Sequence, residues 1–224
     1  STNGAAVINS FNGTPAHLVL NATSDVTYSG LVSGTGELVI QAATGGDQGL
    51  KPLRHPSGTM RQMRGTIATG ATAIYKNSPV KYAADGSIAV ASAGDAILGA
   101  FVGCEFTASG KRFVQNYFPN ATATSDAICY FYGAPEIVYA IQADGVVDQA
   151  DIGSHGDFTN TGTGSTSTGV STATMTATAV TSGTAQLQVL GLYPVEGNAW
   201  GDAYTIVEVQ IAEHQTRGVA SNAF

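Results

Sequence analysis

The chain has 224 residues, of which 43% are hydrophobic and only 11% are charged, and its formal net charge is −7. Soluble domains usually contain about 25% charged residues, so much of the polar surface must come from Thr, Ser, Asn, Gln and the 28 glycines, a surface suited to packing against other proteins. Because the chain is acidic and no apolar run approaches the length of roughly 18 residues that spans a membrane, we expect neither nucleic acid nor a membrane as a partner.

Residues 1–48 are rich in Gly, Ser, Thr and Asn, and turn signals such as Asn12-Gly13 separate short β-like runs. We therefore expect a small β-rich N-terminal module or arm. Its run SGLVSGTGELVI, residues 29–40, resembles one rung of a Gly/Ser/Thr β-solenoid, with small residues at the corners and aliphatic residues inside. A two- or three-stranded flap on the main domain is nevertheless the favoured interpretation of this run.

Residues 49–64 are predicted to form an extended basic arm. Pro52 and Pro56 disfavour a helix or a central strand in this segment. An arm of this kind can lie along the surface of a neighbouring protein and gain order on contact. Its candidate contact residues are Lys51, Arg54, His55, Arg61 and Arg64.

The charges are unevenly spread along the chain. Residues 51–112 hold eight of the nine Lys and Arg residues and carry a net charge of +5, whereas residues 113–224 carry −9. Two interpretations remain open at this point: the two signs pair between separate protein surfaces, which favours orientation and association rate, or they neutralise each other within one fold.

From residue 65 to residue 224 the sequence predicts one main β-domain, a barrel or a sandwich. Strand signals recur every 8–12 residues, which is the spacing typical of these folds. A Thr/Ser/Gly stretch at residues 159–169 is predicted to be a solvent-facing loop, and a helical turn is expected near residues 143–153. The expected strands are residues 65–68, 73–75, 79–82, 87–91, 97–105, 112–117, 127–132, 136–142, 170–181, 185–192 and 204–213.

The apolar run ILGAFVGC, residues 97–104, is predicted to be a central strand buried on both faces. Its two glycines permit a bulge or a close approach of another backbone segment. Cys104 in this run and Cys129 in a second apolar run are the only cysteines. We interpret them as buried free thiols of a protein made in a reducing cytosol.

No catalytic or metal site has a recognisable signature. The four histidines do not have zinc-motif spacing, there is no Gly-x-Ser-x-Gly motif, and the glycine-rich stretches lack the Lys and helix of a phosphate-binding loop. The aspartates at 144, 148, 151 and 157 resemble an oxygen-rich calcium loop only loosely, and solvated turn aspartates are the favoured interpretation. We therefore predict a protein without enzyme activity, metal or cofactor.

The irregular segment 191–203 is rich in large apolar groups and must pack on something. Tyr193, Trp200 and nearby Tyr204 are accordingly predicted to lie in the core or at a subunit interface. A sugar-stacking platform is the alternative, because aromatic rings with neighbouring Asn and Asp residues bind glycans.

Four blocks in a fixed order give the chain a resemblance to a known family. Over residues 49–216 it resembles tailed-phage head proteins assigned as capsid decoration, or cement, proteins. The first 48 residues depart from that pattern. The blocks are GLKPLRHPSG at residues 49–58, GDAILGAFVGCEF at 94–106, YAIQADG at 139–145 and LGLYPVEGNAWGDAY at 190–204.

This resemblance implies a structural virion protein that is assembled in the cytoplasm of a bacterial host and located on the outer capsid surface. Its partners would be the major capsid protein and two further copies of itself, in a trimer at a local three-fold axis of the expanded head. The family implies no catalytic residues. The rival hypotheses are a head-fibre or adhesin-type protein that binds host glycans and, less favoured, a polysaccharide depolymerase.

Overall fold

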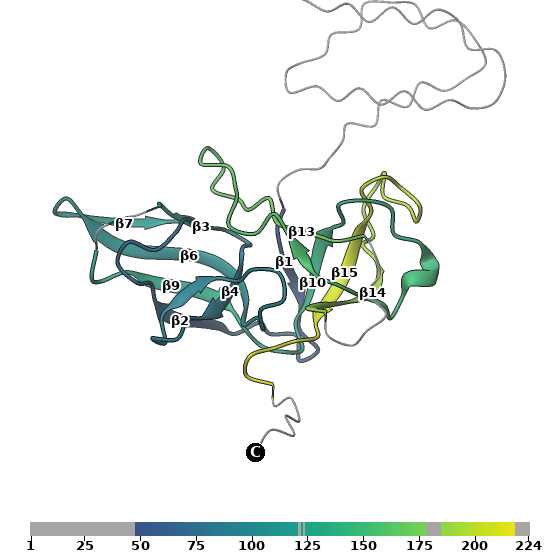
Figure 1. Ribbon diagram of the computed structural model, residues 1–224, viewed down its shortest axis with the longest axis horizontal. Helices are drawn as coiled ribbons and strands as arrows, with labels where there is room; N and C mark the ends of the chain where they lie inside the picture. Colours follow the sequence, from purple (N-terminus) through teal and green to yellow (C-terminus); the bar gives the residue numbers. More distant parts are fainter. Residues whose placement is uncertain (1–47, 121, 123, 178–184, 218–224) are drawn as a thin grey trace, which may run out of the picture. The chain divides into compact units, whose positions relative to one another are not determined.

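The computed structural model describes residues 48–120, 122, 124–177 and 185–217, which all belong to one compact unit, Gln41–Phe224 (Figure 1). The predicted N-terminal module therefore lies outside the described residues, except for residue 48. The described part contains fifteen β-strands and a single 3-10 turn, η1 (Gln149–Asp151), in the segment where a helical turn is predicted. The prediction of an all-β protein is thus confirmed.

The first large sheet has five antiparallel strands in the order β1-β10-β15-β14-β11. Parts of β14 and β15 alternate between buried and half-buried residues, which explains their alternating sequence pattern, whereas β10 is buried from its second residue to its last. Tyr139, Val209 and Val189 lie side by side in the register and are buried, whereas the adjacent row contains the half-buried Gln210 and Gln188. The strands are β1 (Lys51–Arg54), β10 (Val138–Gln142), β11 (His155–Gly156), β14 (Leu187–Leu192) and β15 (Ile206–Ile211).

The second large sheet has six strands in the order β2-β9-β6-β4-β5, with β7 paired to the distal half of β6. Two further two-stranded sheets join β3 to β8 and β12 to β13. The strands of the six-stranded sheet are β2 (Gln62–Thr66), β4 (Pro79–Tyr82), β5 (Ile88–Val90), β6 (Gly99–Ala108), β7 (Lys111–Gln115) and β9 (Ile128–Tyr132). The short strands are β3 (Ile74–Tyr75), β8 (Tyr117–Phe118), β12 (Phe158–Thr159) and β13 (Thr174–Met175).

Strand β6 occupies the centre of the six-stranded sheet, as its apolar sequence predicts. Its first residues are buried, but from Val102 onward buried and half-buried residues mix, because one face of the sheet carries polar groups. The register with β9 shifts between Phe101 and Gly103. At Gly99, a Cβ atom would lie 1.8 Å from the backbone oxygen of Tyr132, so the close approach allows only glycine.

Each large sheet covers its own hydrophobic core. The five-stranded sheet packs on a core that includes Tyr139, Ile141 and Leu187, and the six-stranded sheet packs on one built from phenylalanines such as Phe101 and Phe131. Burying apolar side chains from two sheets of this size is the main source of stability in such a fold.

Buried polar contacts join the segments that lead into the two sheets. The fully buried Gln186 side chain donates from Nε2 to the carbonyls of Ser92 and Asp95, at 2.7 Å each, and accepts a bond from the Phe158 amide at 3.0 Å. Ile97, just before β6, exchanges backbone hydrogen bonds of 2.8 Å with Glu213 and Gln215, just after β15. The 92–97 segment is therefore held against the residue that precedes β14 and the segment that follows β15.

The Thr/Ser/Gly stretch at residues 159–169 is exposed over residues 166–168 but is hydrogen-bonded to the rest of the protein at its end. The Asn116 side chain donates to the Thr168 carbonyl at 2.8 Å, and the Lys76 amide donates to the Gly169 carbonyl at 2.8 Å. Of the strand predicted at residues 170–181, β13 and isolated bridges at Val170 and Ser171 are present, and residues 178–181 lie outside the described residues.

Candidate interaction surfaces

The predicted basic arm contains edge strands of both large sheets. Lys51 and Arg54 belong to β1, at one edge of the five-stranded sheet, and Arg64 belongs to β2, at one edge of the six-stranded sheet. His55 and Arg61 lie in the connection between them. Pro52 fits this arrangement, because an edge strand tolerates a residue that has no N–H group, and Pro56 lies in the turn that follows β1.

Three of the five predicted contact residues already have partners within the chain. The Arg54 guanidinium binds both carboxylate oxygens of Glu208, at 2.8 and 2.5 Å, and this hydrogen bond raises the pKa of Arg54. Lys51 Nζ lies 5.6 Å from the centre of the Tyr193 ring, a cation–π contact. His55 Nε2 lies 3.6 Å from a carboxylate oxygen of Glu136. These contacts fix β1 and the residue after it to the five-stranded sheet.

Arg61 and Arg64 differ from those three residues. Both are exposed, and neither forms an ion pair with any residue in the described ranges. Arg64 is opposite Tyr130 in the β2–β9 register. The exposed edge strand β2 with Arg61 just before it is called the β2 edge below. It presents two guanidinium groups whose charge is available to a partner.

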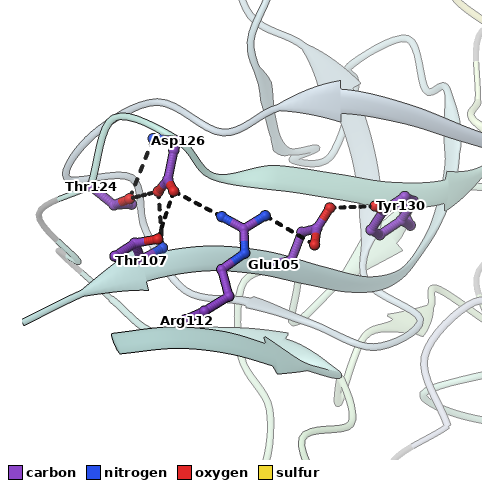
Figure 2. A network of polar contacts seen from close by, with 6 residues as sticks. All are labelled: Glu105, Thr107, Arg112, Thr124, Asp126 and Tyr130. Carbon is purple, nitrogen blue, oxygen red and sulfur yellow. Dashed lines mark hydrogen bonds and ion pairs between the residues drawn. The ribbon is translucent and has the colours of Figure 1, made fainter. Parts of the chain in front are cut away.

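A polar network joins β6, β7, β9 and the segment before β9 in the six-stranded sheet, and its Tyr130 is the register neighbour of the β2 edge (Figure 2). At its centre the Arg112 guanidinium bridges Glu105 at 2.9 Å and Asp126 at 2.8 Å. The Tyr130 hydroxyl donates to Glu105 at 2.6 Å. The network consists of Glu105, Thr107, Arg112, Thr124, Asp126 and Tyr130.

Hydrogen bonds set the ionisation of this network. Those from Thr124 and Thr107 hold the pKa of Asp126 well below its usual range, with a smaller contribution from the charge of Arg112. The bond to Glu105 raises the pKa of the Tyr130 phenol, and the charges of Arg64 and Arg112 oppose that rise. Every charged group of the network thus has a partner within it, and the contacts link β6, β7 and β9.

The three aromatic residues predicted at a subunit interface lie in or next to the loop between β14 and β15, but they differ in exposure. Trp200 is half-buried and packs against the core of the five-stranded sheet. Tyr193 is half-buried beside Lys51, and Tyr204 is 53% exposed. Of the three rings, Tyr204 is therefore the one most available to a partner.

Exposed apolar side chains are frequent on the segments near this end of the five-stranded sheet. The β14–β15 loop is bonded to the 143–153 segment, since the Gly201 amide donates to the Val147 carbonyl at 3.1 Å. Five of the eight exposed large hydrophobic residues of the described part lie on these two segments or at the adjoining bulge of β14. They are named the apolar loop surface and are Val146, Ile152, Leu190, Val195 and Tyr204.

The acidic residues near this surface accept hydrogen bonds from backbone amides. Asp144 accepts a bond from the Ala177 amide, Asp151 accepts one from the Asp148 amide, and Asp202 accepts one from the Ala199 amide, at 2.7 to 2.8 Å. Within the described ranges, no group of three or more His, Cys, Asp or Glu residues is placed to hold a metal ion. Asp151 and Asp202 thus cap turns within their own loops, whereas Asp144 and also Asp157, which accepts a bond from the Gln186 amide at 3.2 Å, join segments that are distant in the sequence.

The two cysteines are free and buried, in agreement with their sequence contexts. No helix in the described part is long and apolar enough to cross a membrane. Comparisons of the chain with protein-family models, with curated proteins and with solved structures give no match.

Proposed function

We propose that this chain is a non-enzymatic structural protein of a tailed-phage virion, one that binds the outer surface of the expanded capsid. The four sequence blocks described above support the assignment to the phage head. The observation that carries docking is the β2 edge, where Arg61 and Arg64 are exposed and form no ion pair within the described part of the chain. The partner surface would be acidic.

Arginine suits this role because its planar guanidinium group forms two parallel hydrogen bonds to a carboxylate. Tyr130 beside Arg64 adds an aromatic ring, and Tyr and Arg are both enriched at protein interfaces. Each copy would contribute only a modest binding free energy, but the contributions of many copies on a closed lattice add up. A protein that binds only the expanded shell stabilises that shell by linkage.

Self-association is the second part of the proposal. A ring of three copies needs two different patches that complement each other. The apolar loop surface with its neighbouring carboxylates is one candidate patch. The other is the β6–β7 hairpin, where Val114 is 78% exposed next to the exposed Lys111 and Phe113. The hairpin combines apolar side chains with a positive charge. It therefore complements the apolar loop surface, which combines apolar side chains with neighbouring negative charges.

Arg54 should be left intact in a docking experiment. Changing it to Glu would place a second carboxylate against Glu208, whose side chain is 14% exposed, and would weaken the fold as well as any docking. The informative variant is Arg61→Glu with Arg64→Glu. A matched control is Lys76→Glu with Arg217→Glu, which makes the same change in charge at two exposed residues that do not belong to the β2 edge.

The assay is co-sedimentation with expanded capsids that lack this protein, with bound copies counted on a quantitative gel against the major capsid protein. We expect the wild type and the control to approach saturation and the double arginine variant to lose at least tenfold in affinity. Equal binding by all three proteins would exclude the β2 edge as the contact. If the wild type itself does not bind, or is present in only a few copies per particle, the decoration proposal fails and a glycan-binding fibre becomes the better hypothesis.

A further inference from the structure

The two cysteines lie directly opposite each other on neighbouring strands. Cys104 on β6 is the register partner of Cys129 on β9. Both side chains belong to the phenylalanine-rich core, and the residues are 1% and 0% exposed. Both thiols are free.

The geometry of an antiparallel pair suits a covalent bond at this position. Directly opposite residues have Cα atoms about 4.5–5.5 Å apart, within the window of roughly 4.4–6.8 Å that a disulfide requires. Opposite residues also point to the same face of the sheet. The sulfurs are close enough that Cys104 adds to the rise in the pKa of Cys129, which burial chiefly causes.

We propose that Cys104 and Cys129 are a latent dithiol that closes into a cross-strand disulfide once the folded protein meets an oxidant outside a reducing cytosol. The bond would join the central strand β6 to β9 and enclose the segment that contains β7 and β8. This inference is independent of the proposed function, because it needs only the sheet and an oxidising environment.

A small peroxide is the simplest oxidant. The thiolate of one cysteine attacks a peroxide oxygen, the O–O bond breaks, and the hydroxide that leaves takes up the thiol proton to form water. The second sulfur then attacks the resulting sulfenic acid, the S–O bond breaks, and a second water leaves with the remaining thiol proton. Two thiols and one hydrogen peroxide thus give one disulfide and two waters.

Burial makes the closure slow. It raises the pKa of the Cys104 thiol to about 12, and the reactive thiolate is correspondingly scarce. The thiols should therefore survive synthesis and folding and react over hours. A low concentration of denaturant that loosens the sheet should accelerate the reaction. The closed form should resist unfolding better, because the cross-link restricts the unfolded chain.

The test uses the full chain, purified with reductant and then treated with hydrogen peroxide. Intact mass under non-reducing conditions should fall by about 2 Da, and peptide mapping should find Cys104 linked to Cys129. The unfolding midpoint should rise by roughly 5–10 °C and return to its original value after reduction. The Cys104→Ala and Cys129→Ala variants should show no such rise.

Three results would overturn the proposal: thiols that remain free under oxidant, thiols that gain oxygen without forming the bond, or a bond that leaves the midpoint unchanged or lowers it. Since these readouts come from the wild type, the proposal stays testable even if the alanine variants do not fold.

Discussion

The fully buried side chain of Gln186 should contribute about a third of the free energy of unfolding of this fold. Changing it to Ala removes its bonds to the Ser92 and Asp95 carbonyls and to the Phe158 amide. A typical hydrogen bond contributes about 1 kcal/mol, and a buried group left without a partner costs about 1–3 kcal/mol. Water can reach part of the 92–95 segment, where Ser92 is exposed, but it cannot easily reach the Phe158 amide.

We therefore expect Gln186→Ala to lower the free energy of unfolding by about 3 kcal/mol, out of the roughly 5–15 kcal/mol of a typical domain. Equilibrium urea unfolding measures the change as a lower midpoint with an unchanged slope. Gln188→Ala is the matched control. Gln188 lies on β14 two residues after Gln186, is half-buried, and makes one side-chain bond within the described part, a long one of 3.4 Å to the Gly153 carbonyl.

The control should lose less than about 1 kcal/mol. If Gln186→Ala loses no more than Gln188→Ala, then the contact between the 92–95 segment and β14 does not contribute to stability as argued. If both lose about 3 kcal/mol, the effect belongs to β14 itself and the bridging role of Gln186 is refuted.

Two further predictions concern a glycine and a histidine. Gly99→Ala should abolish folding, because the added Cβ would lie 1.8 Å from the Tyr132 backbone oxygen. Gly191→Ala is the control: its Cβ would have no atom within 4 Å, so this variant should fold with a normal circular dichroism spectrum. A stable Gly99→Ala protein would contradict the close approach of the two backbone segments. Burial lowers the pKa of His214, with the nearby charge of Arg217 a lesser cause, while the backbone at Leu98 and Gly133 and the charge of Glu136 oppose it. The unfolded chain, with a His pKa of about 6.5, therefore takes up the proton first, so stability should fall as the pH drops below that value. His214→Gln should lose less stability between pH 7.5 and pH 5.5 in urea titrations, and an equal loss would refute this role of His214.

The sequence by itself determined the class of fold and much of its local structure. Alternation and turn residues located most of the strands within a few residues, because those signals are local and follow the two-residue period of a strand. The apolar run around residues 97–104 identified the central strand. The same local logic placed both thiols in the interior, since each cysteine lies in an apolar run.

Only the tertiary structure decided which residues meet. The strands form two large sheets, each with its own core, because β1 pairs with β10 and β2 pairs with β9. No local sequence pattern encodes these pairings. Arg54 and Glu208 are 154 residues apart, so their ion pair could not be read from the sequence, and neither could the exposure of Arg61 and Arg64. Whether Cys104 and Cys129 lie opposite each other depends on the register of β6 and β9, because a slip of one residue would turn one thiol to the opposite face of the sheet.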